Sequence, residues 1–164
     1  MIFEADAFYI DVVEATDLNA VLEVYHSNKD FLLHHMGRDT VTYEWLQNEY
    51  SAMKTSDFCP CKVVGKGSGS IIGIADFRIG CETYLSLLML HSDYQHRGLG
   101  KHIYQAIEEY ARSHSGACIR IDVATDYDNS VFQFWSSRGF SKVQDVTLNW
   151  TGKRFPAVMM KKIL

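Results

Sequence analysis

The residues with the clearest chemical potential run from Gln95 to Gly100, read Gln-His-Arg-Gly-Leu-Gly, and stand where an apolar strand gives way to a helical pattern. Glycine at positions 98 and 100 lets the main chain approach a ligand without a Cβ in the way. The first amides of a helix have no partner inside the helix and lie at the positive end of its dipole. Such a turn suits a pyrophosphate. Arg97 and Lys101 add positive charge, and Gln95 adds a side-chain amide donor.

By spacing alone, the same residues are also compatible with a tight turn and ordinary helix capping. A second glycine-rich stretch, Gly65 to Ser70, invites a phosphate-loop reading as well. It lacks the closing Gly-Lys-Ser/Thr of that loop and is followed by the strand-like segment Ile71 to Ile79 instead of a helix. The sequence therefore predicts a hairpin turn there.

The elements around the first turn form a strand-helix-strand crossover from Tyr84 to Ala124. Tyr84 to Leu90 reads as a strand, and its unbroken run Leu87 to Leu90 predicts burial on both faces. A helix is expected from Gly98 until shortly before Gly116, and Cys118 to Ala124 returns as a strand.

Hydrophobic periodicity predicts the remaining elements. With the crossover included, the order along the whole chain is β-α-α-β-β-β-α-β-α-β-β. Thr16 is expected to cap the first helix, and Thr40 opens the second helical pattern. The segment Ser27 to Asp39 has no clean period and is interpreted as a partly apolar loop or broken helix. The other expected elements are strands at Phe8–Val13, Phe140–Trp150 and Phe155–Ile163, two strands flanking Gly65–Ser70, and a short helix at Ser130–Arg138.

Composition narrows the class of protein. A chain of 164 residues with 47% hydrophobic residues is expected to be a single domain, residues 1–164, with a real core. A net charge of −4 argues against a nucleic-acid or anionic-membrane partner. No stretch reads as a transmembrane helix and the N-terminus does not resemble a signal peptide, so we expect a cytoplasmic protein.

Cysteine and histidine spacing gives no metal motif. Only Cys59 and Cys61 are close among the four cysteines, and we expect all four to be reduced and structural. The adjacent His34 and His35 would point about 100° apart on a helix, a poor arrangement for gripping one ion. No metal cofactor is predicted.

The glycine turn resembles the signature of the GNAT superfamily of N-acetyltransferases, Gln/Arg-x-x-Gly-x-Gly/Ala after the fourth strand, which is complete here as Gln95-x-x-Gly98-x-Gly100. The segment Phe134-Trp135-x-x-x-Gly139-Phe140 is also similar to that family, so the resemblance spans about residues 80–141. It implies an α/β (α+β) fold: a mixed, mostly antiparallel seven-stranded sheet, about four helices, and fourth and fifth strands that splay apart at a bulge.

The resemblance implies acetyl-CoA as co-substrate. Its pantetheine arm would insert between the splayed strands and pair with main chain near Leu88 and Leu90, with Trp135 close by. Asp128 or Asn129 would lie near the arm and cap the short helix; the family asparagine, seven residues before the aromatic, falls on Asp128. The pyrophosphate would bind the amides of Gln95, His96, Arg97, Gly98, Leu99, Gly100 and Lys101.

Acetyl transfer to an amine needs an ammonium that loses its proton, a polarised thioester carbonyl and a stabilised thiolate. A main-chain amide of the fourth strand can serve the carbonyl. For the base, Glu82 is the first candidate, with His91 and Asp76 behind it and a water chain as a further option.

The residue expected to protonate the leaving thiolate, as general acid, departs from the family pattern. Many relatives have tyrosine where Trp135 stands, and an indole N–H has no useful acidity. Tyr127 could replace that phenol, or the thiolate could leave unprotonated. Trp135 and Phe134 are interpreted mainly as core residues.

The predicted function is transfer of the acetyl group of acetyl-CoA to a primary amine, of a small molecule or a peptide, by direct attack in a ternary complex. A homodimer is considered beside a monomer. One alternative is a non-catalytic acyl-CoA-binding module or sensor on the same fold. Another, a nucleotide-binding α/β domain, lacks the long strand-helix alternation and an early Gly-x-Gly-x-x-Gly. Acceptor walls would come from the first two helices, their joining loop and the last two strands.

Overall fold

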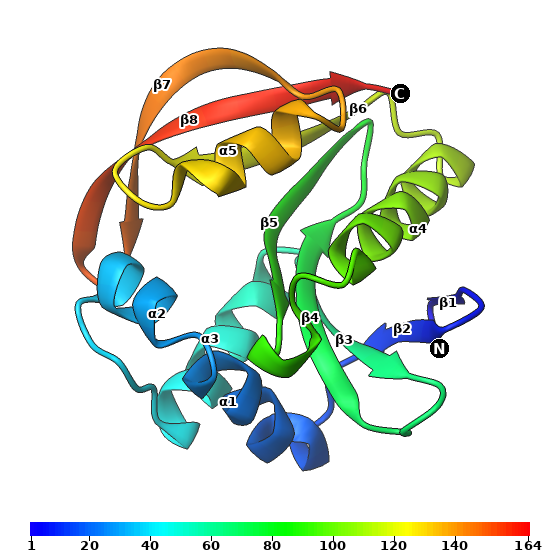
Figure 1. Cartoon of the computed structure of the whole chain (residues 1–164), viewed down its shortest axis with the longest axis vertical. Coiled ribbons are helices and arrows are strands. Elements are labelled where there is room, and N and C mark those ends of the chain that lie inside the picture. Colours follow the sequence, from blue (N-terminus) through cyan, green and yellow to red (C-terminus); the bar gives the residue numbers. More distant parts are fainter.

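A single eight-stranded sheet organises the chain, and the computed structural model describes all residues, 1–164 (Figure 1). The strands lie in the order β1-β2-β3-β4-β5-β6-β8-β7, and every neighbouring pair is antiparallel except β5 and β6. Their bounds are β1 Phe3–Glu4, β2 Phe8–Val12, β3 Cys59–Gly65, β4 Ile71–Arg78, β5 Glu82–Leu90, β6 Cys118–Ala124, β7 Ser141–Trp150 and β8 Lys153–Ile163.

This architecture confirms the predicted class, with one strand and one helix more than expected. The additional strand, β1, has only two residues and pairs with β2 at Phe3 and Ile10. So short a strand has no readable alternation. The hairpin turn predicted at Gly65–Ser70 is confirmed, because the Gly65 amide donates to the Ser70 carbonyl and joins β3 to β4.

Helices cover both faces of the sheet. On one face, α1 (Leu18–His26), α2 (Lys29–Met36) and α3 (Tyr43–Thr55) pack with Ile74 and Met89. On the other, α4 (Leu99–Ser113) and α5 (Asn129–Ser136) pack with Ala75, Phe77 and Leu85. Two apolar layers therefore enclose β4, which explains its nearly continuous burial. None of the helices is both long and apolar enough to cross a bilayer.

The additional helix, α2, lies in the segment interpreted as a loop or broken helix. It follows Asn28 directly and ends at Gly37, whose φ of 73° is left-handed. Leu32, His35 and Met36 form its buried side, and two adjacent histidines there obscure the apolar period. The predicted helix starts shift as well: Thr42, not Thr40, accepts the capping hydrogen bond of α3 from the Trp45 amide, and Asp17, not Thr16, precedes α1 after a 3₁₀ turn at Ala15–Asp17.

Strand β5 is less buried than its apolar run suggested. Met89 is buried, but Leu87, Leu88 and Leu90 remain partly exposed. The reason is topological: β5 pairs with β6 only from Glu82 to Tyr84, so its remaining length has a neighbour on one side alone.

Asn28 ties the helical layer to the end of β5. Its side-chain amide donates to the Leu90 carbonyl at 2.9 Å and to the Val24 carbonyl at 2.8 Å, and its oxygen accepts from the Gln95 side chain at 2.7 Å. One half-buried side chain thus joins the α1–α2 junction, β5 and the glycine turn.

Removing this amide should destabilise the protein. Asn28→Ala removes the hydrogen bonds that join Val24, Leu90 and Gln95 through one side chain, so we expect a loss of about 2 kcal/mol in the free energy of unfolding by urea denaturation. Asn19→Ala, at an exposed position of α1, is the control and should change stability little. Equal stabilities for the two variants would mean that Asn28 does not hold the junction.

Candidate functional site

The site begins where the sheet divides. β5 and β6 pair at Glu82–Tyr84 and Cys118–Arg120, and beyond these residues each strand keeps only its outer partner, β4 for β5 and β8 for β6. The pairing of β4 with β5 shifts opposite the same point, between Asp76 and Phe77, so that Ser86 is skipped. Such a bulge bends a strand. The strands expected as the fourth and fifth are β5 and β6 of the structure, because β1 precedes the first expected strand. The predicted splay between them, with a bulge beside it, is therefore present.

The glycine turn follows β5 and opens α4. His96 and Gly98 have φ angles of 59° and 77°, and Gly98 is the N-cap of α4. No acceptor within the protein takes the main-chain amides from His96 to Lys101. Successive unpaired amides at a helix N-terminus form an anion site, and the exposed Arg97 and Lys101 stand on the same segment. The residues present therefore fit a pyrophosphate.

Two residues predicted to contact the cofactor are engaged elsewhere. The Gln95 side-chain nitrogen donates to the Asn28 side chain and to the Leu90 carbonyl, at 2.7 and 2.9 Å, and the Gln95 main-chain amide donates to the Ser92 carbonyl. Gln95 thus braces the turn instead of offering a free donor to an anion. The Leu90 carbonyl already accepts from two side chains.

The start of α5 faces this turn. Asp128 is the N-cap and accepts a hydrogen bond from the Ser130 amide at 2.9 Å, so the capping role falls to Asp128 and Asn129 is the first helical residue. Hydrogen bonds from Ser130 lower the pKa of Asp128, and the nearby charge of His96 adds to this effect. Phe134 lies against Gly100, where an added Cβ would stand 3.8 Å from its ring.

A cavity of about 430 Å³ runs through the gap between β5 and β6. It joins the two faces of the sheet, because its walls include Tyr25 and Met53 from α1 and α3 and Val131 and Trp135 from α5. Most of the walls are apolar. The lining residues are Tyr25, Phe31, His35, Glu49, Met53, Phe58, Asp76, Tyr84, Leu85, Ser86, Leu87, Leu88, Ile121, Asp122, Val123, Ala124, Tyr127, Val131, Trp135, Leu148, Asn149, Trp150 and Phe155.

Asp76 is the most unusual polar group in this cavity. It is 3% exposed, stands at the bulge opposite Leu87, and its Oδ1 atom has no hydrogen-bond partner. Burial raises the pKa of its carboxyl well above the usual range, and the main-chain amide of Cys61 offsets this only in part. A buried carboxyl with a free oxygen at a bulge is suited to accept a proton or to bind a cation.

The His35 side chain carries no charge at neutral pH. Burial lowers its pKa to about 4, although its Nδ1 atom lies 2.9 Å from the Phe31 carbonyl. Its ring stacks on that of Phe31, with centroids 3.9 Å apart. The neighbouring His34 contacts His35, with the two Nδ1 atoms 3.3 Å apart, and places its own Nε2 2.7 Å from Oδ1 of Asp126. Of the two histidines, only His35 lines the cavity.

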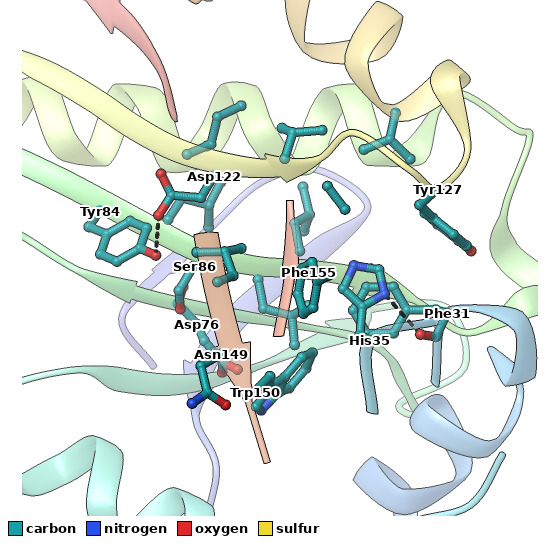
Figure 2. A pocket seen from close by; sticks show the side chains of 18 of the residues that line it. Phe31, His35, Asp76, Tyr84, Ser86, Asp122, Tyr127, Asn149, Trp150 and Phe155 are labelled. Carbon is teal, nitrogen blue, oxygen red and sulfur yellow. Dashed lines mark hydrogen bonds between the residues drawn. The ribbon is translucent and has the colours of Figure 1, made fainter. Parts of the chain in front are cut away.

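A closed network lines the opposite wall. The Tyr84 hydroxyl donates to Asp122 at 2.8 Å, and the Arg120 guanidinium bonds the same carboxylate at 2.9 Å. Figure 2 shows Tyr84, Asp122, Ser86 and Asp76 toward one end of the cavity, with His35 and Phe31 toward the other. Asp122 is thus already compensated, whereas Asp76 is not.

The structure distributes the predicted catalytic residues unevenly. Glu82 lies at the closed end of the β5–β6 pair, exposed and ion-paired with Lys161, and does not line the cavity. His91 follows β5 and accepts from the Asp93 amide, also outside the cavity. Tyr127 lines the cavity, but its hydroxyl points away from the other labelled side chains (Figure 2), and burial raises its pKa. Asp76, ranked behind Glu82, is the one candidate base that the fold buries in the cavity.

Sequence reasoning also missed Glu49 and Trp150, which line the cavity from α3 and β7. A helix and a strand so distant in sequence give no sign that they meet. Asp76 did leave a sign, an acid inside the apolar strand Ile71 to Phe77. Trp135 is 8% exposed and packs edge-on against Tyr104 and Phe140, as expected of a core residue, and it also lines the cavity.

Comparison with known proteins gives one family and one fold. Residues 20–140 match the acetyltransferase (GNAT) family. No curated protein matches the sequence.

Solved structures align over nearly the whole chain. An N-acetyltransferase from Thermoplasma acidophilum in complex with coenzyme A is 17% identical, with a TM-score of 0.68 over 97% of this chain and 100% of that one. The ribosomal-protein-S18-alanine N-acetyltransferase from Escherichia coli is 16% identical, with a TM-score of 0.69 over 95% and 93%. A chimera of the spermidine N-acetyltransferase from Vibrio cholerae and hSSAT is 13% identical, with a TM-score of 0.73 over 96% of each chain.

The burial of Asp76 predicts a stability that depends on pH. Above about pH 4 its carboxyl ionises in the unfolded chain but stays protonated in the folded one, so wild-type stability falls as pH rises toward the raised pKa. Asp76→Asn has no such penalty, and its advantage should grow from pH 4 to pH 8 by about 1.4 kcal/mol per unit of pKa elevation.

Urea denaturation at several pH values measures this difference. Asp39→Asn, at an exposed position outside the cavity, controls for the loss of one negative charge. An advantage of Asp76→Asn that stays constant with pH would show that the carboxyl ionises equally in both states.

Proposed function

Because the chain belongs to the acetyltransferase (GNAT) family, we propose that it transfers the acetyl group of acetyl-CoA to a primary amine. One arrangement supports this function above all: a cavity passes through the divided sheet, with a row of unpaired amides at the following turn and a buried carboxyl within its walls. The row of unpaired amides fits an anionic co-substrate, and the buried carboxyl fits an amine that must lose a proton.

The co-substrate would be held by the turn and the open edge of β5. The amides from His96 to Lys101 would bind the pyrophosphate, assisted by Arg97 and Lys101. The main chain near Leu88 would pair with the pantetheine arm, and Trp135 and Asp128 would lie along it. When bound, acetyl-CoA supplies an acyl group activated as a thioester.

Asp76 would accept the proton of the acceptor ammonium. A base serves best when its pKa lies near the working pH. Burial moves the pKa of Asp76 upward, toward that range, whereas burial lowers the pKa of His35 to about 4 and makes its imidazole a poor proton acceptor. We therefore prefer Asp76 to Glu82, which lies outside the cavity and is paired with Lys161.

The main chain of β5 would polarise the thioester carbonyl. The strand is skipped at Ser86, beside Asp76 and at the point where β5 leaves β6. A main-chain amide there has no strand neighbour on the β6 side, and fixed amide donors can stabilise developing negative charge on oxygen.

Direct attack of the amine on the thioester fits the positions of the cysteines. All four are free, and none of them lines the cavity. Cys61 is buried in β3, with its Sγ 3.2 Å from that of Cys59, while Cys81 is exposed. No thiol is therefore placed to carry the acetyl group as an intermediate.

The similar structures include enzymes named for a ribosomal-protein alanine and for spermidine, which supports an amine of a protein or of a small molecule as the acceptor. The alternative is a module that binds acyl-CoA without catalysis. Release of CoA from acetyl-CoA in the presence of an amine panel, together with mass detection of the acetylated amine, separates the two.

Substitution of Gly98 should weaken CoA binding. A valine at this position meets no protein atom within 4 Å of its Cβ, but it has a left-handed φ of 77° and would project its side chain beside the unpaired amides. We expect Gly98→Val to lower CoA affinity at least ~10-fold by calorimetry, since close approach to the backbone is lost.

Gly69→Val is the matched control. Gly69 has a φ of 69°, open space around its Cβ and a place in the β3–β4 turn, so the substitution causes similar backbone strain far from the α4 turn. Equal CoA affinity in the two variants would exclude the α4 turn as the pyrophosphate site.

The base assignment is tested by Asp76→Asn and Glu82→Gln together. Loss of a general base costs ~100-fold or more, so Asp76→Asn should lower kcat by that factor at pH 7 while calorimetric CoA affinity stays near wild type. Glu82→Gln should keep most of the activity. Since only the ionised carboxyl accepts a proton, the wild-type rate should rise with pH. The reverse ranking of the two variants would return the role to Glu82.

A further inference from the structure

We infer that the acceptor is a small hydrophobic monoamine without a carboxylate, bound through its ammonium at Asp76 and Glu49 and through its hydrocarbon body by aromatic rings. This inference rests on the proposed function and names the substrate class of the same cavity. It is drawn from the walls, the charges and the enclosure of the part of the cavity that faces α1, α2 and α3.

The walls are aromatic and mutually braced. Phe31 packs edge-on against Trp150, with centroids 5.7 Å apart, and stacks on His35 at 3.9 Å. Phe155 packs edge-on against His35 at 5.0 Å, and both line the cavity. These rings offer faces and edges to a hydrocarbon, and ring faces attract an ammonium.

The charges are one-sided. No lysine or arginine lines the cavity, and the lining histidine is neutral at physiological pH. The lining carboxyls are Asp76, Glu49 and Asp122, and Arg120 already compensates Asp122.

Neither Glu49 nor Asp76 forms an ion pair within the protein. The negative charge of Glu49 raises the pKa of Asp76 further, in addition to the effect of burial. An ammonium bound in this part of the cavity would compensate the negative charge of both carboxyls. A carboxylate on the acceptor would instead be buried with no cation among the lining residues, which is unfavourable.

The enclosure restricts size. The Lys153 ammonium, next to the β7–β8 turn, donates to the carbonyls of Leu33 and His34 in α2, the former at 3.3 Å. His34 in turn bonds Asp126 beyond β6. Helix α2, which contributes Phe31 and His35 to the cavity wall, is thus fastened on two sides, and Figure 1 shows it beside the end of the β7–β8 hairpin. A wall held in this way limits the size of the acceptor that the cavity can take.

The scarcity of neutral polar groups other than those on aromatic rings disfavours a peptide. Ser86 and Asn149 are the uncharged amide or aliphatic hydroxyl side chains among the lining residues, and Ser86 donates to the Asp76 carbonyl. Main-chain groups of a peptide acceptor would be buried here with few partners, at a cost for each.

A matched panel of amines tests the inference: 2-phenylethylamine, phenylalanine, spermidine and an alanine-initiated hexapeptide. Phenylalanine is 2-phenylethylamine with one added carboxylate, so it isolates the charge. We expect kcat/KM for 2-phenylethylamine to exceed that for phenylalanine by at least ~100-fold, because the carboxylate loses its hydration without gaining a cation. Spermidine and the peptide should also be poorer acceptors.

Variants locate the effect. Glu49→Arg places a cation at the cavity and should shift the ratio of kcat/KM at least ~10-fold toward phenylalanine, as expected for a charge reversal at a partly buried site. Trp150→Ala should weaken 2-phenylethylamine binding to the CoA-bound protein ~5-fold by calorimetry, through loss of ring contact. Tyr43→Ala, an exposed aromatic outside the cavity, is the control. Melting temperatures show which variants are folded.

The outcomes separate this inference from the proposed function. Efficient acetylation of phenylalanine, spermidine or the peptide, with 2-phenylethylamine inferior, would overturn the substrate class and leave the acetyltransferase intact. CoA binding without acetylation of any amine would overturn the proposed function itself. A Glu49→Arg variant that is folded and keeps the wild-type ratio would remove Glu49 from the acceptor site.

Discussion

The separation of β5 from β6 after Tyr84 is the constraint on which the site depends. β5 must leave one neighbour without losing the other, and several contacts hold it to β4 while it turns away. Gly73 permits the close approach, since a Cβ there would stand 2.8 Å from the Met89 carbonyl oxygen and from the Leu90 side chain. Asn28 and Gln95 then fix the Leu90 carbonyl. The gap is therefore a built feature of the sheet with its own supporting contacts.

The same gap explains why a costly group can persist in the core. Asp76 stands on β4 among apolar neighbours, and one of its carboxyl oxygens is buried without a hydrogen-bond partner. This burial costs folding free energy, which packing elsewhere must offset. The two apolar clusters on the faces of the sheet supply that packing. A carboxyl in such a place has little structural value, which is why its position at the bulge, opposite Leu87 and within the cavity, points to chemistry.

Local patterns were sufficient for much of this fold. The glycine turn, the crossover from Tyr84 to Ala124, the Gly65–Ser70 hairpin and the splayed strands all follow from short-range signals or from the family motif. Helix α2 did not, because His34 and His35 interrupt its apolar period, and β1 was too short to show one. Glu82 and Asp76 could not be ranked from sequence, because their order depends on strand register. The bulge at Ser86 and the short β5–β6 pairing decide which carboxyl lies in the cavity, and Glu49 and Trp150 meet it only through tertiary packing.

A division within a sheet also creates two strand edges in the interior of the molecule. Edges elsewhere invite pairing with other chains and are commonly blunted by charge, proline or short length. Here β5 beyond Tyr84 carries mainly leucine and methionine, with no ionisable residue before His91. Its protection comes from the helices on both faces, α1 to α3 on one and α4 and α5 on the other. These layers cover the free edge of β5 on both faces of the sheet, so the edge is shielded from other chains by packing and does not depend on charge, proline or short length.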